Sequence, residues 1–490
     1  MHRPTHEDGV AAALSEVVGG PAGRRARPHS WWTPVRVLMA VFTVVFALAV
    51  IQKYPCGKTN WSDEKVRYSK MCYSDVPYLY TGRGFAEHRW PYDDPDGRYS
   101  PMEYPVLISY FAYGTSLITA LVPSGPPQDV RAVTSPDAMF GLPGMAKEVN
   151  TYFLVTAVLL FLCGLGSVFF LAGASPGRPW DAMGMVLSPL LLVSALVNWD
   201  LIAVLFTAGA LWAWARGRPF LAGVMVGLGF ATKLYPLFLL GAFLVDALRR
   251  RRPEGFAVAV AAAAGAWIVV NLPALVSSEA AWKVFWSFNS DRAADLGSLW
   301  LVLDQHGHHS SAHTINVVSG AFFALACAAI LALGLAARKR PEVAQVAFLV
   351  VVAFLVVNKV YSPQYVLWLL PLAALARPRW RDLLIWQACE LLYFGSVWLY
   401  LGGWLAPSSG DNPTAYQIAI VVRVLGELYL AALVVRDIWT TEPGEDEWDE
   451  DAWAEVERSE TSAHDHGVER GGGEAHPDVD GLADLGHRGT

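Results

Sequence analysis

Long apolar runs, separated by short polar stretches, fill most of the sequence between residues 35 and 435. A soluble protein could not keep so many such runs away from water, whereas helices that cross a bilayer need stretches of about this length. The sequence therefore predicts an all-α, polytopic membrane protein. The runs, about twelve in all, lie at about 35–51, 103–122, 149–173, 181–197, 200–215, 219–247, 255–275, 314–337, 342–358, 363–376, 382–402 and 414–435.

Basic residues at the ends of the runs predict the orientation of the chain. A basic stretch at 24–27 precedes the first run, and basic clusters at 249–252 and 338–340 separate later runs. Lys and Arg collect in the cytoplasmic loops of membrane proteins. We therefore expect a cytoplasmic N-terminus and external loops at 52–102 and 276–313.

The orientation of the first half is ambiguous. Arg216 and Arg218 favour the cytoplasm, yet a single span from 219 to 247 would put them outside. A hairpin with its apex at 231–233 solves this conflict but changes the direction of an earlier helix. Charge counting leaves both alternatives open.

Both termini differ in composition from the apolar region at 35–435, which we take as one transmembrane domain. Residues 1–34 are polar, and residues 441–490 hold roughly sixteen acids against three arginines. Such segments cannot bury enough apolar surface to fold. We expect residues 1–34 and the tail at 436–490 to be disordered and cytoplasmic.

Cysteine and histidine give no metal pattern. Cys56 and Cys72 both lie in the first loop, where they either form a disulfide or remain two free thiols. His306, His308 and His309 lack the spacing of a tetrahedral site, so we expect them in an exposed loop.

The longest polar interruption near the start is the stretch 72–105, CYSDVPYLYTGRGFAEHRWPYDDPDGRYSPMEYP. Asp75 precedes Tyr78 within it, and Glu103 and Tyr104 lead into the next apolar run. A carboxylate near the membrane edge can take a proton from a hydroxyl while the rest of a substrate stays in lipid. The alternative is that Asp75 merely caps a short helix of the loop.

Two lysines lie within or beside apolar runs, where an unpaired charge is costly. Lys233 lies in GFATKLYPLF and Lys359 in VVNKVYSPQYVLWLLPL. Each can bind a lipid phosphate, or can extend to the headgroups without any substrate. Arg292, in the 276–313 loop, is a further candidate to meet a phosphate.

Four other charged residues interrupt apolar runs. Arg423 and Glu427 are four residues apart, hence on one helix face, and we expect them and Glu390 to serve structure. Asp200 is the second candidate acid. It lines the same cavity as Asp75 if its turn is external, and caps a helix if the turn is internal.

Three motifs carry a resemblance to a known family. They are Asp-x-x-Tyr followed by Gly, Pro-Tyr and Tyr-Pro in the first loop, Lys-x-x-Pro at Lys233, and Ser-Pro-Gln-Tyr before Leu-Trp-Leu-Leu-Pro. Together they resemble glycosyltransferase family 87, membrane mannosyltransferases of the GT-C fold that use polyprenyl-phosphate sugars. The resemblance covers roughly residues 35–435. The sequence departs from it in a cysteine-bearing insertion before Asp75 and in Val106, where many relatives have a second proline.

The resemblance implies a GT-C-like bundle with a structured first external loop. It implies transfer of a sugar, most often mannose, with inversion, from a polyprenyl-phosphate donor to a lipid or glycan acceptor outside the plasma membrane. No metal, cofactor or nucleic acid is expected. Asp75 is the expected base, with donor phosphate contacts from Lys233, Lys359 and Arg292. Expected substrate contacts are Tyr78, Glu103, Tyr104, Asp200, Asn358, Tyr361, Gln364 and Tyr365.

Two other classes of function fit the same composition. A transporter or flippase for a lipid-linked precursor would use a basic, aromatic cavity but needs no external carboxylate base. A scaffold whose acidic tail binds a cytoplasmic partner needs neither. An enzyme requires Asp75 and the phosphate-binding cations to face one cavity, and this is the feature that separates the three.

Overall fold

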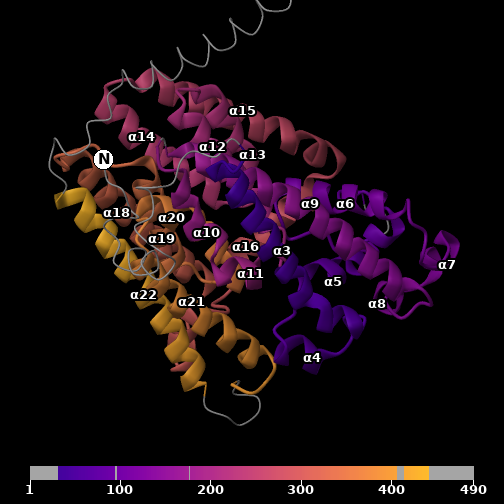
Figure 1. The fold of residues 1–490 in the computed structure, drawn as a ribbon. Coiled ribbons are helices and arrows are strands. Elements are labelled where there is room, and N and C mark those ends of the chain that lie inside the picture. The colour runs from indigo at the N-terminus through magenta and orange to yellow at the C-terminus, as the bar shows by residue number, and fades with distance from the viewer. Residues whose placement is uncertain (1–30, 94–96, 176, 406–412, 441–490) are drawn as a thin grey trace, which may run out of the picture. The chain divides into compact units, whose positions relative to one another are not determined.

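The computed structural model describes residues 31–93, 97–175, 177–405 and 413–440, which fall within one compact unit of the chain. Over these ranges the regular secondary structure is entirely helical (Figure 1). The prediction of an all-α fold is confirmed. Residues 1–30 and 441–490, most of the predicted disordered termini, lie outside the described residues.

Six of the described helices are long and apolar enough to cross a membrane, in agreement with a polytopic protein. They are α3 (Pro34–Lys58), α9 (Met145–Ala174), α15 (Pro253–Ser277), α18 (Ala312–Ala336), α21 (Trp380–Leu401) and α22 (Thr414–Thr440). Shorter apolar helices accompany them: α6 (Val106–Thr119), α12 (Asp200–Ala215), α13 (Pro219–Phe230), α19 (Val343–Val357), and η4 (Pro363–Tyr365) with α20 (Val366–Ala376). Because α22 continues to Thr440, the tail begins later than the predicted residue 436.

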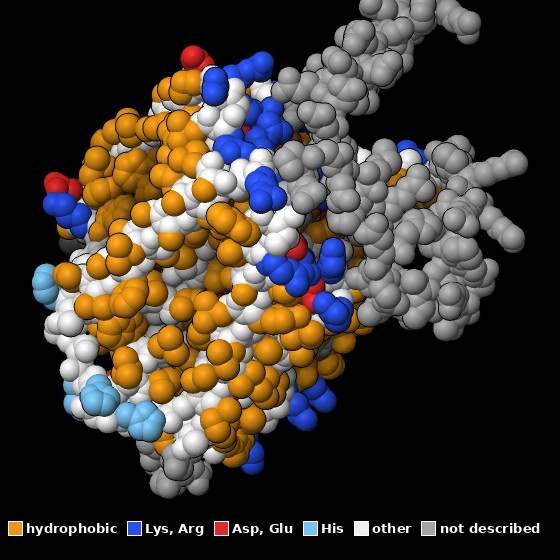
Figure 2. Space-filling model, turned by 90° about the vertical axis from the view of Figure 1, so that its left-hand side faces the viewer, with side chains coloured by type: hydrophobic (Ala, Val, Ile, Leu, Met, Phe, Trp, Pro, Cys, Tyr) orange, Lys and Arg blue, Asp and Glu red, His pale blue; other side chains and the backbone are white. Residues whose placement is uncertain are grey.

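The surface over α18 and α22 is suited to lipid. Figure 2 shows a broad area of apolar side chains on this face, with Lys and Arg gathered to one side of it. Leu325 and Phe322 of α18 and Leu425 of α22 are each more than half exposed. Exposed apolar area of this extent marks contact with a membrane or a partner.

The apolar run at 181–197 does not form a single helix. It is divided into η2 (Pro179–Ala182), α10 (Met183–Val186) and α11 (Pro189–Ser194). The Ser188 hydroxyl caps α11 by accepting a hydrogen bond from the Leu190 N–H, and Pro189 has no N–H to continue the preceding helix. The run ends at the first loop, since the Val197 carbonyl accepts a hydrogen bond from the Asp75 N–H.

The run at 219–247 adopts the hairpin alternative. Its helices, α13 and α14 (Leu239–Arg250), are joined by a turn and η3 (Tyr235–Phe238). Gly223 packs on Ala259 and Gly227 on Ala263, so α13 and α15 run in the same direction. A Cβ on Gly223 would lie 2.2 Å from the Ala259 carbonyl oxygen, so this approach requires glycine. α14 leads into the start of α15 and therefore runs opposite to α13.

The hairpin brings together the basic ends of α12, α13, α14 and α15. The Trp214 indole N–H, at the end of α12, donates a hydrogen bond of 2.8 Å to Asp246 in α14. Arg216 and Arg218 therefore lie at the same end of the molecule as the basic cluster at 249–252, as the positive-inside rule requires.

The first loop is larger than predicted. Because α3 continues to Lys58, the loop begins later than residue 52. Both ends of α6 stay near this loop: the Leu107 N–H donates to the Ala231 carbonyl at the hairpin turn, and Arg131, beyond α6, donates to the Ala86 carbonyl. We therefore assign residues 59–144 to a first-loop region, and the run predicted as a span at 103–122 forms the shorter helix α6, which is not among the six spanning candidates.

Short helices build the first-loop region, and Figure 1 shows them grouped beside α3 and α9. They are α4 (Glu64–Ser69), α5 (Asp75–Gly82), η1 (Phe85–Glu87), α6, α7 (Gln128–Val133) and α8 (Pro136–Met139). The first loop is structured, as predicted, but it includes more residues than predicted.

Three interactions fix the start of α5 to the end of α3. Cys56 and Cys72 form a disulfide, so the pairing alternative is the observed one. Gln52 donates a hydrogen bond of 2.7 Å to the Met71 carbonyl, and Lys53 donates one of 2.9 Å to the Tyr73 carbonyl. The segment that leads to Asp75 is therefore held on a membrane helix.

Candidate active site

Asp75 is the first residue of α5, but it does not cap this helix. Ser74 is the cap, and its hydroxyl accepts a hydrogen bond from the Val76 N–H. The Asp75 N–H donates to the Val197 carbonyl at 2.8 Å. Because the neighbouring serine fulfils the capping role, the Asp75 carboxylate makes tertiary contacts instead.

The Asp75 carboxylate accepts hydrogen bonds from three side chains. The Tyr73 hydroxyl lies 2.6 Å from Oδ1, while the Asn198 amide lies 2.6 Å and the Tyr104 hydroxyl 3.3 Å from Oδ2. The Asn198 amide also donates to the Tyr104 hydroxyl at 2.8 Å. We call these four residues the Asp75 cluster. It joins the first-loop region to the start of α12.

Burial controls the protonation of this cluster. It raises the pKa of Asp75, and the hydrogen bonds from Tyr73 and Asn198 and the charge of Lys233 only partly oppose the rise. Burial and the nearby Asp75 charge also raise the pKa values of Tyr73 and Tyr104, so both hydroxyls stay protonated donors. The carboxyl is therefore a stronger base than an exposed aspartate.

Lys233 and Asp200 lie on the other side of Tyr104. The Lys233 ammonium, in the hairpin turn, is 4.8 Å from the centroid of the Tyr104 ring and 3.5 Å from Asp200 Oδ1. Asp200 Oδ1 also accepts a hydrogen bond of 2.7 Å from the Trp368 indole. Asp200 thus lies near the surroundings of Asp75 but is fully buried, so its place in a cavity shared with Asp75 stays a prediction.

Residues 362–365 are linked to Asp200 through Trp368. The Tyr365 ring stacks on the Trp368 ring at a centroid distance of 3.9 Å, and Trp368 holds Asp200. Tyr365 lies within electrostatic reach of both Arg292 and Asp200. Gln364 is buried beside it in η4. Tyr365 therefore connects the surroundings of Asp200 with those of Arg292.

Lys359 and Arg292 form a second group. Arg292 pairs with Asp295 at 2.5 Å. The Lys359 ammonium donates to the Asn316 side chain at 2.7 Å and to the Ser290 carbonyl at 3.2 Å. Burial, with the charge of Arg292 adding to it, lowers the pKa of Lys359. The Lys359 ammonium is thus occupied by protein acceptors, whereas Arg292 stays about a quarter exposed.

Four predicted substrate contacts have partners within the protein. The Tyr78 hydroxyl donates to the Trp61 carbonyl at 2.7 Å, and burial raises the pKa of Tyr78 to about 12. Glu103 pairs with Arg83 at 2.5 Å. The Asn358 amide donates to the carbonyl of Val360, and the Tyr361 hydroxyl to Glu390. Of these four, only Tyr78 reaches the Asp75 cluster, by stacking on Tyr73.

Buried charges in α21 and α22 support the loops that carry these residues. Arg423 donates to Glu427 at 2.8 Å and to the Gly297 carbonyl at 3.0 Å, and its guanidinium lies 3.7 Å from the centroid of the Tyr361 ring. Glu390 accepts from the Tyr361 hydroxyl at 3.0 Å. These contacts fix the loops around Arg292 and Lys359, consistent with the structural role expected for the three charges.

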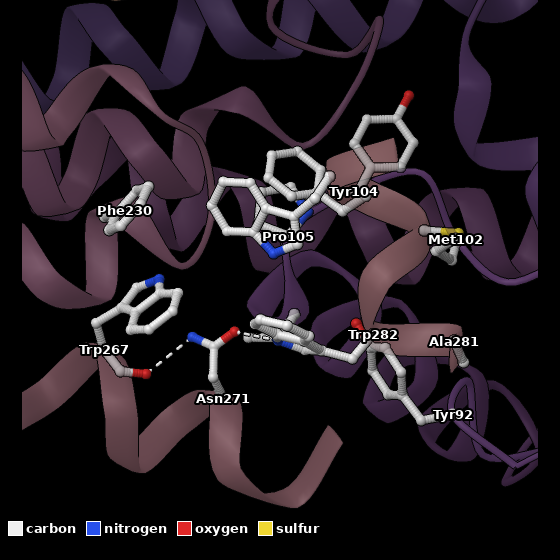
Figure 3. A pocket seen from close by; sticks show the side chains of 12 residues that line it. Tyr92, Met102, Tyr104, Pro105, Phe230, Trp267, Asn271, Ala281 and Trp282 are labelled. Carbon is white, nitrogen blue, oxygen red and sulfur yellow. Dashed lines mark hydrogen bonds between the residues drawn. The ribbon is translucent and has the colours of Figure 1, made fainter. Parts of the chain in front are cut away.

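An aromatic pocket adjoins the Asp75 cluster. Figure 3 shows Tyr104 in its wall, with the hydroxyl directed away from Trp267 and Phe230. Asn271 donates to the Trp267 carbonyl and accepts from the Trp282 indole, both at 2.8 Å. The pocket is lined by Tyr92, Met102, Tyr104, Pro105, Val106, Phe230, Trp267, Asn271, Ala281, Trp282, Phe285 and Trp286. Tyr104 therefore belongs to both the pocket and the Asp75 cluster.

Comparison with known proteins bears on the central part of the chain. Residues 138–358 match glycosyltransferase family 87. The resemblance to this family is thereby confirmed over that segment, which contains Asn198, Asp200, Lys233 and Arg292. Asp75 and Tyr104 lie outside the matched residues, in the first-loop region. No curated protein matches the chain.

The chain is also similar to a solved structure. It is the crystal structure of ArnT from Cupriavidus metallidurans bound to undecaprenyl phosphate. The two chains are 15% identical, and the similarity covers 82% of this chain and 77% of that one, with a TM-score of 0.41.

Three residues at the site were not predicted from the sequence. Tyr73 and Asn198 contact Asp75, and Trp368 contacts Asp200. Asn198 carries a usable signal, since a polar side chain between two apolar runs needs a partner or a function. Tyr73 and Trp368 carry none, because aromatic residues are common at the ends of membrane runs.

Proposed function

We propose that the protein is an integral membrane glycosyltransferase that moves a sugar from a polyprenyl-phosphate donor to an acceptor hydroxyl, with inversion. One observation carries the proposal: Tyr104 contacts Asp75 through its hydroxyl and Lys233 through its ring. A base and a phosphate-binding cation thus lie on two sides of one side chain. The match of residues 138–358 to family 87 supports the same reaction class.

Asp75 is the proposed general base. Its raised pKa brings it closer to the pH at which a carboxylate transfers protons efficiently. The acceptor hydroxyl gives its proton to Asp75, and its oxygen forms a bond to the anomeric carbon. The bond from that carbon to the phosphate oxygen breaks, and the lipid phosphate leaves with the electron pair. Tyr73 and Asn198 hold the carboxylate in place.

Lys233 and Arg292 are the proposed contacts of the leaving phosphate. Lys233 contacts the ring of Tyr104, whose hydroxyl contacts Asp75. Arg292 lies within electrostatic reach of Tyr365. Cations in a water-poor site stabilise developing negative charge more strongly than they would in water. Each of the three cations has a protein acceptor, Asp200 for Lys233 and Asp295 for Arg292, whereas the Lys359 ammonium has two, on α16 (Glu279–Asp291) and α18. We assign Lys359 to the support of the Arg292 loop.

The aromatic pocket is the proposed site of the first prenyl units of the donor. Its wall includes the lipid-exposed helix α15, where Val269 and Val276 are more than two thirds exposed. An apolar chain can therefore enter from the bilayer. Mannose is the sugar expected from the family resemblance. The basic clusters gather at the opposite ends of the helices, which favours an extracytoplasmic site in the plasma membrane.

Transfer of radiolabelled sugar from polyprenyl-phosphate-mannose in membranes tests the proposal. Asp75→Asn removes the proton acceptor, so transfer should fall by about 10²–10⁴-fold while donor binding persists. Asp137→Asn, on the exposed surface of α8, is the matched control. Near-normal transfer by Asp75→Asn would exclude Asp75 as the base. Lipid movement across the bilayer without any transfer would favour the transporter.

A further inference from the structure

A group of arginines lies where α14, α15 and α18 begin or end, and the reaction proposed above uses none of them. Arg249 is in the last turn of α14, residues 251 and 252 form the turn to α15, and Arg338 follows α18. Figure 2 shows Lys and Arg side chains gathered to one side of the apolar area that covers α18. We define the arginine surface as Arg249, Arg251, Arg252 and Arg338 with the neighbouring Leu248 and Leu335.

Arg249 joins α14 to α18. Its guanidinium donates hydrogen bonds to the Leu335 carbonyl at 3.0 Å and to the Arg338 carbonyl at 3.4 Å. The two helices approach closely just before this point, since a Cβ on Gly334 would lie 2.6 Å from the side chain of Val245. The basic segment after α18 is therefore held beside the basic end of α14.

The turn from α14 to α15 keeps its arginines near Arg249. Arg251 has a φ of +56°, a left-handed backbone conformation that is uncommon for residues other than glycine. The Arg252 N–H donates to the Ala247 carbonyl at 3.0 Å, so the chain reverses within two residues. Three residues of chain span at most about 11 Å, which is the upper limit for the distance between the backbones of Arg249 and Arg252.

The charges of the arginine surface are not balanced by acids. Asp246, the acid of α14, accepts from the Trp214 indole at 2.8 Å and pairs with Arg250 at 3.0 Å and Arg340 at 3.5 Å. Glu254, in the first turn of α15, is exposed. Within the described residues, neither Glu254 nor any of the four arginines of the surface forms an ion pair. The surface therefore carries a net positive charge.

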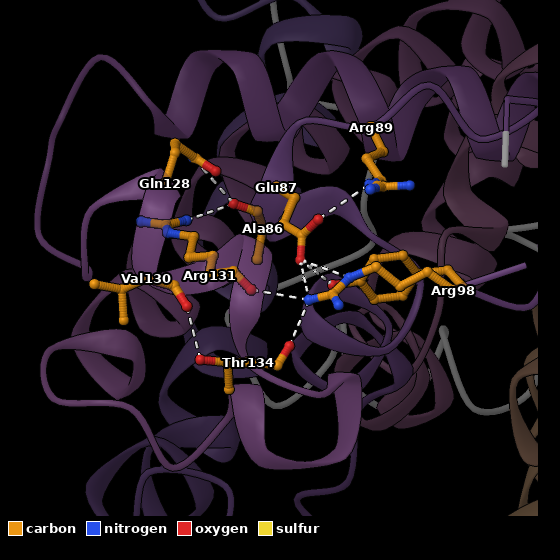
Figure 4. A network of polar contacts seen from close by, with 9 residues as sticks. Ala86, Glu87, Arg89, Arg98, Gln128, Val130, Arg131 and Thr134 are labelled. Carbon is orange, nitrogen blue, oxygen red and sulfur yellow. Dashed lines mark hydrogen bonds and ion pairs between the residues drawn. The ribbon is translucent and has the colours of Figure 1, made fainter. Parts of the chain in front are cut away.

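Arginines of the first-loop region show the opposite arrangement. Arg98 donates to Glu87 at 2.8 Å and to the Arg131 carbonyl at 2.9 Å (Figure 4). Arg89 donates to Glu87 at 3.0 Å, and Arg131 pairs with Glu148 at 2.6 Å. A guanidinium that already has a carboxylate partner gains little from a further anion. Among these groups of described arginines, only the arginine surface therefore has charge available for an anionic ligand.

Exposed apolar side chains adjoin the arginine surface. Leu248 precedes Arg249 in the chain, and Leu335 supplies the carbonyl that Arg249 contacts. These two leucines and Val258, in the second turn of α15, are between 41% and 43% exposed. Arginines beside half-exposed apolar side chains, at the ends of apolar helices, match an amphiphile with an anionic headgroup. A free inorganic anion would contact the arginines but leave the leucines uncovered.

Anionic phospholipids supply such a headgroup on the side of the membrane where Lys and Arg collect. The cytoplasmic leaflet has a negative surface potential, and it attracts basic segments next to membrane helices. Arginine stays charged and binds phosphate through paired N–H donors. The phosphodiester of a glycerophospholipid can therefore lie against the arginines while its acyl chains cover Leu248 and Leu335.

We propose that the arginine surface binds an anionic glycerophospholipid such as phosphatidylglycerol, which joins the ends of α14, α15 and α18. The twelve residues of α14, about 18 Å of helix, separate this site from η3 and the turn that carries Lys233. The inference therefore does not depend on the proposed glycosyltransferase function.

Native mass spectrometry of the full-length protein, released from detergent and titrated with single lipids, tests the site. Phosphatidylglycerol should bind the unaltered protein about tenfold or more tightly than phosphatidylcholine does. Arg251→Gln/Arg338→Gln removes two charges at exposed positions and should weaken phosphatidylglycerol binding about 25-fold. Arg251→Gln alone should weaken it about fivefold. Phosphatidylcholine binding should stay the same in both variants.

Arg379→Gln/Arg436→Gln is the matched control, because it removes the same charge from exposed positions outside the arginine surface. This control should bind phosphatidylglycerol like the unaltered protein. Equal weakening by the two double variants would show a general attraction to the basic end of the molecule and overturn the site. Equal affinity for the two lipids, or displacement of phosphatidylglycerol by millimolar inorganic phosphate, would also overturn it.

Discussion

Asn198 and Asp75, 123 residues apart in the sequence, are joined by a hydrogen bond of 2.6 Å. Asn198 is almost completely buried, and its side-chain oxygen accepts from the Trp199 N–H, so the orientation of its amide is fixed. The contact places a carboxylate of the first-loop region at the start of α12. The position of the proposed base thus depends on a residue of the segment that matches glycosyltransferase family 87.

Replacement of Asn198 tests this dependence. Asn198→Leu keeps the approximate volume but removes the donor to both Asp75 and Tyr104. A buried hydrogen bond to a charged group is worth about 1.5–3 kcal/mol, so we expect kcat to fall by roughly 10- to 100-fold. The KM for the donor should change little, because Asn198 lies on the Asp75 side of Tyr104. Initial rates at varied donor concentration measure both, with Asn289→Leu on the exposed face of α16 as control.

The raised pKa of Asp75 predicts an unusual pH profile. A base with a raised pKa becomes protonated at a higher pH, so kcat/KM should fall on the acidic side well above the ordinary aspartate value of about 3.9. The charge of Lys233 lowers the pKa of Asp75, so in Lys233→Met the acidic fall should move to still higher pH. Lys359→Met should leave it in place. An acidic fall near pH 4 in the unaltered protein would contradict the assignment.

The apolar runs predicted the helical fold, but they did not separate spans from loop helices. α6 is as apolar as its neighbours, yet contacts of Leu107 and Arg131 place it in the first-loop region. Hydropathy measures composition, whereas membrane crossing depends on where the two ends of a helix are held. Likewise Ser188 and Pro189 break a run that is apolar enough for one helix.

For the site, the sequence predicted which residue types matter better than it predicted their partners. Asp75, Tyr104, Asp200 and Lys233 come together as expected for a shared site. Lys359 has the same appearance in the sequence as Lys233, a lysine at an apolar run followed by tyrosine and proline. The two lysines differ in their tertiary partners, Asn316 for Lys359 and Asp200 for Lys233, and a contact across 43 residues leaves no local pattern.

The two lysines should therefore differ when replaced. Lys233→Ala should raise the KM for the polyprenyl-phosphate donor about tenfold or more, because it removes a cation from the proposed phosphate contacts. Lys359→Ala should instead lower the thermal unfolding temperature, since it leaves Asn316 and the Ser290 carbonyl without their donor. Donor titrations and thermal unfolding in the same detergent separate the two effects. Equal increases in donor KM for both variants would show that Lys359 also contacts the phosphate.

The Cys56–Cys72 disulfide should stabilise the position of Asp75, because it ties the segment before α5 to the end of α3. It closes a loop of about fifteen residues, which corresponds to about 3 kcal/mol in the chain-entropy account. The Cys56→Ser/Cys72→Ser double variant should unfold at a lower temperature. The hydrogen bonds from Gln52 and Lys53 hold the same segment, so part of the transfer activity should remain below that temperature. Cys327→Ser, at a partly exposed position in α18, is the control. Complete loss of transfer in a double variant that unfolds at the unaltered temperature would show that the disulfide acts on the site itself rather than on stability.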